Sequence, residues 1–165
     1  MFRSQASLTR GSLLNRTSVL LETQGLRTVT AGYAARVQTP TDLDDLTDFF
    51  DRYGTALTRG DVSAIAGCYA LPGMVVADSY SFTFASPAAV ALSFLGAAPA
   101  YREQQIVAAH AQLRDVQRLS PALAMVAVQW EYLDSRGDVV PGESYRYLLR
   151  SEADGPRITT VISTH

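Results

Sequence analysis

The chain has 165 residues, of which 47% are hydrophobic, and it carries a net charge of −2. This length and composition predict one globular domain with a core of its own rather than a disordered chain. The charge offers no basic face for nucleic acid, and no apolar run approaches the ~20 residues needed to cross a bilayer. We therefore expect neither nucleic acid nor a membrane as a partner.

The residues that usually anchor cofactors are scarce in this chain. All 14 basic residues are arginine, which excludes a Schiff-base lysine and the lysine of a phosphate-binding loop. The single cysteine, Cys68, excludes an internal disulfide framework and a cysteine-based metal cluster. The two histidines, His110 and His165, are too few for a histidine-rich zinc site. We therefore expect a protein that works without a metal or an organic cofactor.

Residues 1–40 differ in composition from the rest of the chain. They contain five arginines against one acid, a charge of +4, whereas residues 41–165 contain nine arginines against 15 acids, a charge of −6. An arginine-rich and serine-rich start is typical of an organelle transit peptide, but an extension without function has the same composition. We predict an extension over 1–40, either flexible or transit-like, and one domain over 41–165. A cytoplasmic location is expected, with organelle targeting through residues 1–40 as the alternative.

The first part of this domain predicts two helices. An amphipathic helix is expected up to Arg59, because apolar residues recur at steps of three and four. These residues are Leu43, Leu46, Phe50, Tyr53 and Leu57. Gly60 is suited to end this helix in a left-handed conformation, and Asp61 is suited to cap the start of the next one. The second helix is expected over 62–69, with Leu71-Pro72-Gly73 as its stop.

A hairpin and a third helix are expected next. The segments 74–77 and 80–84 have the pattern of strands, and Asp78-Ser79 between them is typical of a tight turn. Ser86-Pro87 then combines a capping residue with a proline at the first helical position. The helix that starts there is expected to continue to about Gly96.

The remainder of the chain predicts a meander of strands. Runs of strand-like residues, separated by turn residues, cover 105–119, 122–133, 143–150 and 157–164. The second run is the most regular, because Val126, Val128, Trp130 and Tyr132 alternate with other residues and fall on one face. Helices that precede strands in this way predict an α+β domain with a mostly antiparallel sheet.

Two parts of the domain resemble the NTF2-like superfamily, and within it the SnoaL-like and ketosteroid-isomerase-like proteins. The first is RYGTALTRGDVSAIAGCYA followed by MVVAD, which is similar to the first two helices and first strand of that family. The second is VAVQWEYLDSRGDVV with ESYRYLLR and GPRITTVIST, which is similar to its last strands. The resemblance implies a cone in which a strongly curved sheet wraps around three helices of the N-terminal half and encloses an apolar pocket. Isomerases, dehydratases and cyclases share this fold, and many members form homodimers.

The resemblance also implies candidate catalytic residues. In the isomerases of the family, a tyrosine of the first helix donates a hydrogen bond to the oxygen that becomes negative, and an aspartate after the first strand transfers the proton. Tyr53 and Asp78 occupy these places, and Glu143 lies near the position of a second acid. Such an arrangement moves a proton within an apolar cavity, where burial and neighbours tune the pKa of each group.

Each of these three residues also has a purely structural interpretation. Tyr53 lies on an apolar stripe, where a tyrosine commonly belongs to the core. Asp78 lies where the hairpin turns, and aspartate is favoured there because it bonds to nearby backbone amides. Glu143 depends on the strand register, because a shift of one residue moves it from the Trp130 face to the solvent face.

A pocket of the expected kind would bind a small apolar or amphipathic molecule. Six aromatic residues are predicted to line it: Phe50, Tyr69, Phe94, Trp130, Tyr145 and Tyr147. The alternative function is a non-catalytic homodimeric module for binding or scaffolding, which associates through the sheet.

Overall fold

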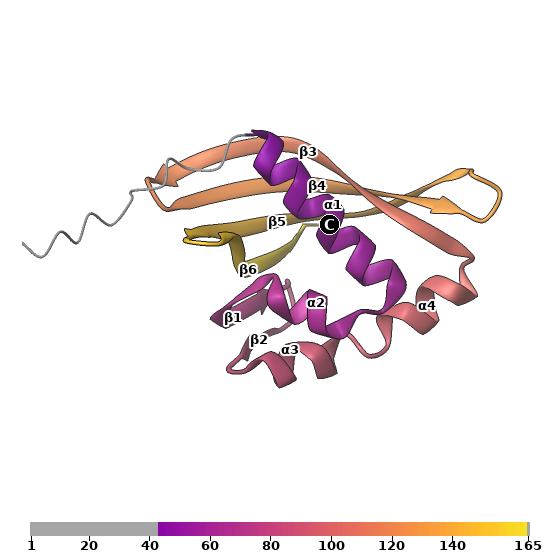
Figure 1. Ribbon diagram of the computed structural model, residues 1–165, viewed down its shortest axis with the longest axis horizontal. Helices are drawn as coiled ribbons and strands as arrows, with labels where there is room; N and C mark the ends of the chain where they lie inside the picture. Colours follow the sequence, from indigo (N-terminus) through magenta and orange to yellow (C-terminus); the bar gives the residue numbers. More distant parts are fainter. Residues whose placement is uncertain (1–42, 165) are drawn as a thin grey trace, which may run out of the picture. The chain divides into compact units, whose positions relative to one another are not determined.

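The computed structural model describes residues 43–164, so the predicted extension over 1–40 lies outside the described residues. Four helices and six strands make up this part of the chain (Figure 1). The helices are α1 (Leu43–Arg59), α2 (Val62–Gly67), α3 (Pro87–Ser93) and α4 (Ala97–Glu103). The strands are β1 (Tyr69–Val76), β2 (Ser81–Phe84), β3 (Ile106–Ser120), β4 (Leu123–Asp134), β5 (Val139–Glu152) and β6 (Gly155–Thr164).

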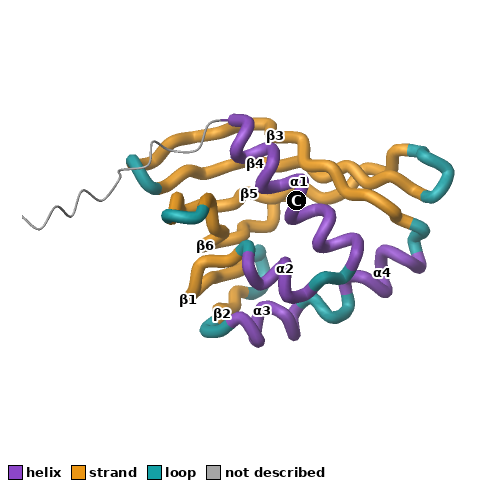
Figure 2. The backbone as a smooth tube through the Cα atoms, in the orientation of Figure 1, coloured by secondary structure: helices purple, strands orange, loops and turns teal. Residues whose placement is uncertain are grey.

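The six strands form one sheet in the order β2-β1-β6-β5-β4-β3. Only β1 and β6 pair in parallel, and the other four neighbouring pairs are antiparallel. The helix α1 packs against β3, while α2 and α3 lie together beside β1 (Figure 2). The predicted α+β domain with a curved, mostly antiparallel sheet is therefore confirmed.

The boundary between the first two helices follows the predicted signals. Gly60 adopts a φ of 69°, a left-handed conformation that costs little without a Cβ atom. The Asp61 Oδ1 atom then accepts a hydrogen bond from the backbone N–H of Ala64 at 2.9 Å, which caps α2. Four residues of the predicted apolar stripe of α1 are buried, but Leu43 in its first turn is 61% exposed.

The second helix is shorter than predicted, because Tyr69 begins a strand. The helix ends at Gly67, and β1 runs from Tyr69 through Pro72 and Gly73 to Val76. Tyr69 is paired with Ile158 of β6, whose N–H donates a hydrogen bond to the Cys68 carbonyl oxygen at 2.8 Å. This partner is 89 positions away in the chain, so local spacing could not reveal it.

A fourth helix, α4, was not predicted. The third helix ends at Ser93, and α4 follows over Ala97–Glu103 in a segment that contains Pro99. Proline is tolerated in the first turn of a helix, because the N–H groups there have no partner within the helix. The predicted third helix therefore ends early, and the chain turns at Gly96 into a new one.

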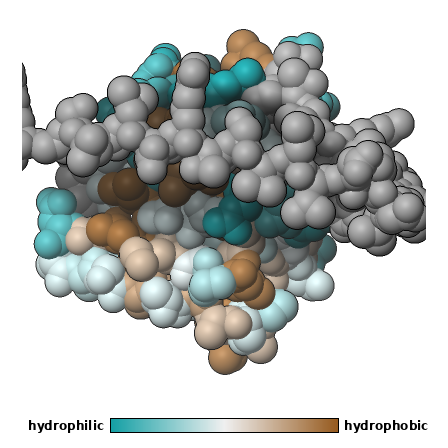
Figure 3. Space-filling view, turned by 90° about the vertical axis from the view of Figure 1, so that its left-hand side faces the viewer, coloured by the Kyte–Doolittle hydropathy of each residue, from teal (hydrophilic) through white to brown (hydrophobic). Residues whose placement is uncertain are grey.

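The predicted inner face of β4 belongs to the core, together with residues of α1. Val126, Val128, Trp130 and Tyr132 are all buried, at 0 to 8% exposure. Elsewhere on the surface, hydrophobic side chains are scattered among hydrophilic ones on the part of the face that Figure 3 shows in colour. Among the helices of residues 43–164, none is long and apolar enough to cross a membrane.

Candidate functional site

A cavity of about 730 Å³ lies between α1, α4, the β1–β2 hairpin and the inner face of β4, β5 and β6. Eleven of its 23 lining residues are aromatic. Its buried end is formed by residues such as Tyr53, Tyr69 and Trp130, while Asp78 and Glu143 are exposed at its mouth. The cavity therefore has an aromatic interior and an acidic opening.

Two tyrosine hydroxyls meet at the buried end. The hydroxyl oxygens of Tyr53 and Tyr69 are 2.9 Å apart, and either of them is able to donate. Tyr53 is held there by the buried stripe of α1, and Tyr69 by its place at the start of β1. Since one hydroxyl donates to the other, the pair keeps one proton that is free to be donated to another group.

A second donor lies close to this pair. The Trp130 Nε1–H group donates to the Tyr147 hydroxyl oxygen at 2.9 Å, which leaves the Tyr147 proton free to be donated. The ring of Tyr53 lies 6.1 Å from the ring of Trp130 and 6.3 Å from that of Tyr147. Tyr53, Tyr69, Trp130 and Tyr147, which we call the donor cluster, thus place two hydrogen-bonded pairs side by side at the base of the cavity.

The hydroxyls of this donor cluster remain protonated at physiological pH. Burial raises the pKa of Tyr53 and of Tyr147 well above the usual value of 10.0, because a phenolate is poorly solvated there. Burial also raises the pKa of Tyr69. The cluster therefore offers neutral hydrogen-bond donors, and it is suited to an acceptor such as a carbonyl oxygen.

Glu143 lies at the mouth on the cavity side of the sheet. Its Oε2 atom accepts a hydrogen bond from the Tyr132 hydroxyl at 2.9 Å. Burial raises the pKa of Tyr132, and the charge of Glu143 adds to this effect. The ring of Tyr101 from α4 lies 5.5 Å from the ring of Tyr132, so α4 and β4 approach each other there. Of the two registers that the sequence left open, the structure has the one that places Glu143 on the Trp130 face.

Asp78 lies in the turn of the hairpin and also lines the cavity. It lies in the β1–β2 connection, which is closed by a hydrogen bond from the Ala77 N–H to the Tyr80 carbonyl oxygen at 2.9 Å. Its exposed side chain also lines the mouth. Within the described part of the chain, the Tyr53 hydroxyl bonds to Tyr69 and to no carboxylate. The structure therefore brings Tyr53, Asp78 and Glu143 to one cavity without a direct bond from Tyr53 to either acid.

Five of the six predicted pocket residues line the cavity, and one lies behind it. The lining residues are Tyr69, Phe94, Trp130, Tyr145 and Tyr147. Phe50 instead lies in the core at 0% exposure, with its ring 6.3 Å from that of Trp130 and 5.0 Å from that of Tyr147. A helical stripe shows which face is buried, but the depth of each residue depends on what packs against it.

Further lining residues come from the α4 segment and the hairpin, and they are not among the six predicted pocket residues. Tyr101 of α4 and Gln104 directly after this helix line the cavity, and Tyr80 and Phe82 line it from the hairpin. The positions 97, 100, 101 and 104 have helical spacing and all line the cavity, so they were the available signal. Within residues 43–164, no three side chains of His, Cys, Asp or Glu are placed to hold a metal ion together.

A curved sheet that closes with helices around an aromatic cavity defines an α+β cone domain. The chain belongs to the NTF2-like family, because residues 44–165 match the family model described as NTF2-like protein (DUF6841). No curated protein matches the sequence.

Solved structures share the fold at low sequence identity. An NTF-2 like protein of unknown function from Shewanella oneidensis MR-1 is 18% identical, with a TM-score of 0.55 over 74% of this chain and 98% of that one. An NTF2-like protein with a cystatin-like fold from Novosphingobium aromaticivorans is 18% identical, with a TM-score of 0.56 over 78% and 84%. A ketosteroid isomerase-like protein from Erwinia carotovora atroseptica is 19% identical, with a TM-score of 0.51 over 74% and 95%. At these identities the likeness concerns the fold alone.

Proposed function

We propose that this protein binds a small apolar or amphipathic molecule in its cavity, with a carbonyl or similar acceptor directed at the donor cluster. The observation that carries the proposal is the buried bond between the Tyr53 and Tyr69 hydroxyls at the base of a cavity of about 730 Å³. This volume lies in the usual range for small-molecule sites, which are mostly apolar with a few convergent polar groups. A purely apolar ligand would leave the free protons of the cluster without an acceptor.

We extend the proposal to cofactor-independent chemistry of the isomerase, dehydratase or cyclase type. One carboxylate, that of Asp78 or of Glu143, would take a proton from a carbon at the mouth end of the ligand that is conjugated with the carbonyl, and the electron pair would move through the conjugated bonds to the carbonyl oxygen. The donor cluster would stabilise the negative charge that develops on this oxygen, and return of the proton at another carbon would complete an isomerisation. The placement of both acids on the lining of the same cavity supports these roles.

The proposal is tested with variants that lack hydroxyl groups of the donor cluster. Their binding of 2-acetylnaphthalene, an apolar ketone, is measured through the fluorescence of Trp130, the only tryptophan of the sequence. The single variant Tyr53→Phe is expected to bind almost normally, because Tyr69 keeps a proton to donate. The double variant Tyr53→Phe/Tyr69→Phe and the single variant Tyr147→Phe are each expected to bind about 2- to 10-fold more weakly, the effect of one neutral hydrogen bond.

Tyr80→Phe is the matched control, because it removes a hydroxyl from the exposed mouth and leaves the donor cluster intact. Thermal unfolding of each variant establishes that it is folded before binding is compared. Wild-type affinity in both the double variant and Tyr147→Phe would contradict the proposed role of the donor cluster.

A second candidate function is the homodimeric module, which one feature of the sheet favours. On the face opposite Trp130, the partially exposed residues Met74, Met125 and Leu148 belong to one row across the strands. Half-exposed apolar side chains in such a row are typical of an association surface. We propose that this face pairs with a second copy of the chain.

Sedimentation tests this second proposal. The wild type is expected to sediment as a dimer at micromolar concentration, and Leu148→Asp as a monomer, because the variant places a charge in the middle of the row. The control Leu92→Asp changes an exposed leucine on α3, at 68% exposure, and is expected to leave the dimer intact. If the wild type sediments as a monomer, the homodimeric module is excluded.

A further inference from the structure

We infer that the ligand carries a positive charge, and that the cavity mouth holds this charge between Glu143, Asp78 and the faces of aromatic rings. The expected ligand is therefore an apolar amine or quaternary ammonium compound with an acceptor group at its other end. This inference rests on the proposed binding function and adds the class of ligand to it.

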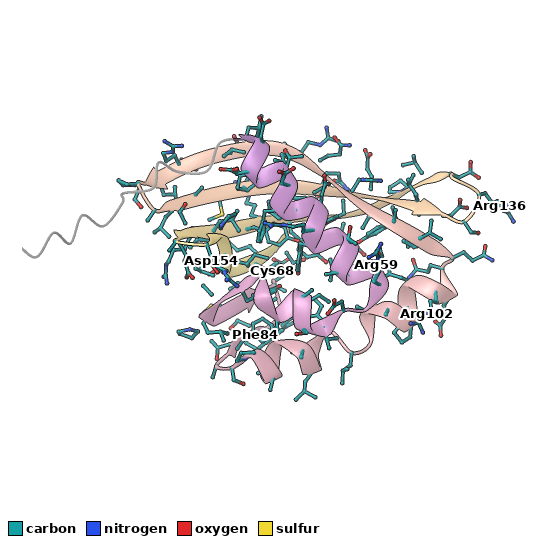
Figure 4. The ribbon with its side chains drawn as sticks, viewed as in Figure 1. Arg59, Cys68, Phe84, Arg102, Arg136 and Asp154 are labelled. Carbon is teal, nitrogen blue, oxygen red and sulfur yellow. The ribbon has the colours of Figure 1, made fainter. Side chains whose placement is uncertain are left out.

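The charged residues that line the cavity are all acidic. Asp78 and Glu143 are its two ionisable carboxylates, and none of the other lining residues is arginine or histidine. Two arginines of the neighbouring segments lie away from the cavity, since Figure 4 shows Arg136 at the tip of the β4–β5 turn, pointing away from the fold, and Arg102 at the edge of the fold on α4. An anionic ligand would therefore find repulsion at the mouth, with no cation among the described lining residues to compensate it.

Aromatic rings accompany these carboxylates at the mouth. The rings of Tyr80 and Phe82 are stacked with centroids 6.1 Å apart, and both side chains are exposed, at 58% and 40%. The half-buried Tyr145 lies in the same region: burial raises its pKa, and the charge of Glu143 and the nearby Tyr101 and Tyr80 add to this effect. The face of an aromatic ring attracts a cation through its quadrupole, and a neighbouring carboxylate strengthens the attraction.

The side chain of Glu143 is oriented for this role. Its Oε2 atom accepts the Tyr132 hydrogen bond, the one hydrogen bond of this carboxylate among the described residues. The Oε1 atom thus remains able to pair with a cationic group. Because Tyr132 is itself buried in the β4 face, its hydrogen bond holds the exposed carboxylate of Glu143 against the cavity mouth.

A neutral ligand of the same shape would bind without using either carboxylate. The cavity then has two distinct ends for a ligand: the donor cluster at the base recognises an acceptor, and the acidic aromatic mouth recognises a cation. A molecule that satisfies both ends has an apolar body between a carbonyl-type oxygen and an ammonium group. Such a molecule gains charge attraction that its neutral and anionic analogues lack.

The test compares four probes that share one acetylnaphthalene body. The first is 2-acetylnaphthalene itself, and the others carry a trimethylammoniomethyl, hydroxymethyl or carboxymethyl group at the far end of the ring system. Binding is measured through Trp130 fluorescence at low ionic strength. The cationic probe is expected to bind about 10-fold more tightly than the carboxylate probe, with the two neutral probes between them. Added salt is expected to reduce the difference in affinity between the cationic and carboxylate probes, because the mouth is open to solvent.

Two variants test whether the preference for the cationic probe depends on the carboxylates at the cavity mouth. Glu143→Gln and Asp78→Asn are each expected to weaken binding of the cationic probe about 2- to 5-fold more than binding of 2-acetylnaphthalene. The control Glu103→Gln makes the same charge change at the end of α4, outside the cavity lining, and is expected to change neither. This inference would be overturned if the cationic and carboxylate probes bound equally well, or if both variants kept the wild-type preference for the cationic probe. Either result would leave the proposed binding function intact. Failure of all four probes to bind would overturn the proposed function and this inference together.

Discussion

Phe50→Ala is expected to lower the free energy of unfolding by about 3 to 5 kcal/mol, the usual cost of removing a buried phenylalanine ring. The Phe50 side chain is at 0% exposure and packs edge-on against Phe49 and Tyr147, with ring centroids 5.2 and 5.0 Å apart. Its ring also supports Trp130 from behind the cavity wall. Denaturant unfolding, followed by circular dichroism, measures the change.

Phe82→Ala is the matched control for this prediction. It removes the same ring from the mouth of the cavity, where the side chain is 40% exposed, and is expected to cost about 1 kcal/mol or less. If the two variants were equally stable, Phe50 would not belong to a packed core. The comparison thus separates a residue of the core from a residue of the cavity lining.

Gly54→Ala is expected to destabilise the protein, although alanine is the better helix former. In a helix without tertiary contacts, this change would gain about 0.5 to 1 kcal/mol. In the folded domain, a Cβ atom at Gly54 would lie 2.6 Å from the Ala109 carbonyl oxygen and 3.0 Å from Trp130 Cζ3. Overpacking of this kind costs about 1 to 3 kcal/mol, because α1 must move away from β3. The expected net result is a lower midpoint of thermal unfolding.

Gly67→Ala is the control, because it makes the same substitution at the end of α2. A Cβ atom there would meet nothing within 4 Å, so the variant is expected to be as stable as the wild type or more stable by up to about 1 kcal/mol. A Gly54→Ala protein that gained stability as well would show that α1 does not approach β3 this closely.

Gly54 also matters for the site, since it lies next to Tyr53 on α1. The close approach of the helix to β3 sets the depth of the Tyr53 hydroxyl beside Tyr69 and Trp130. A shift of α1 would therefore move one member of the donor cluster relative to the other three. We expect the geometry of the site and the stability of the α1–β3 packing to be coupled for this reason.

Most helices and strands were predictable because their signals are local. The end of α1 at Gly60 and the cap of α2 at Asp61 depend on residues within a few positions of each other. The alternation from Val126 to Tyr132 likewise indicated a strand with one buried face. The spacing of Tyr69 predicts a helix, whereas its strand pairing with Ile158 is a contact between distant parts of the chain.

In the candidate site, too, some features follow from local sequence and others from contacts between distant parts of the chain. The sequence by itself determined the class of fold, the lack of lysine, and the aromatic and acidic residue types from which the site is built, because composition and periodicity are local properties. The tertiary structure alone decided that Tyr53 meets Tyr69, that Glu143 bonds to Tyr132 on the cavity side, and that Phe50 lies behind the wall. These contacts depend on strand register and on how closely α1 packs, which are settled only when segments far apart in the chain come together.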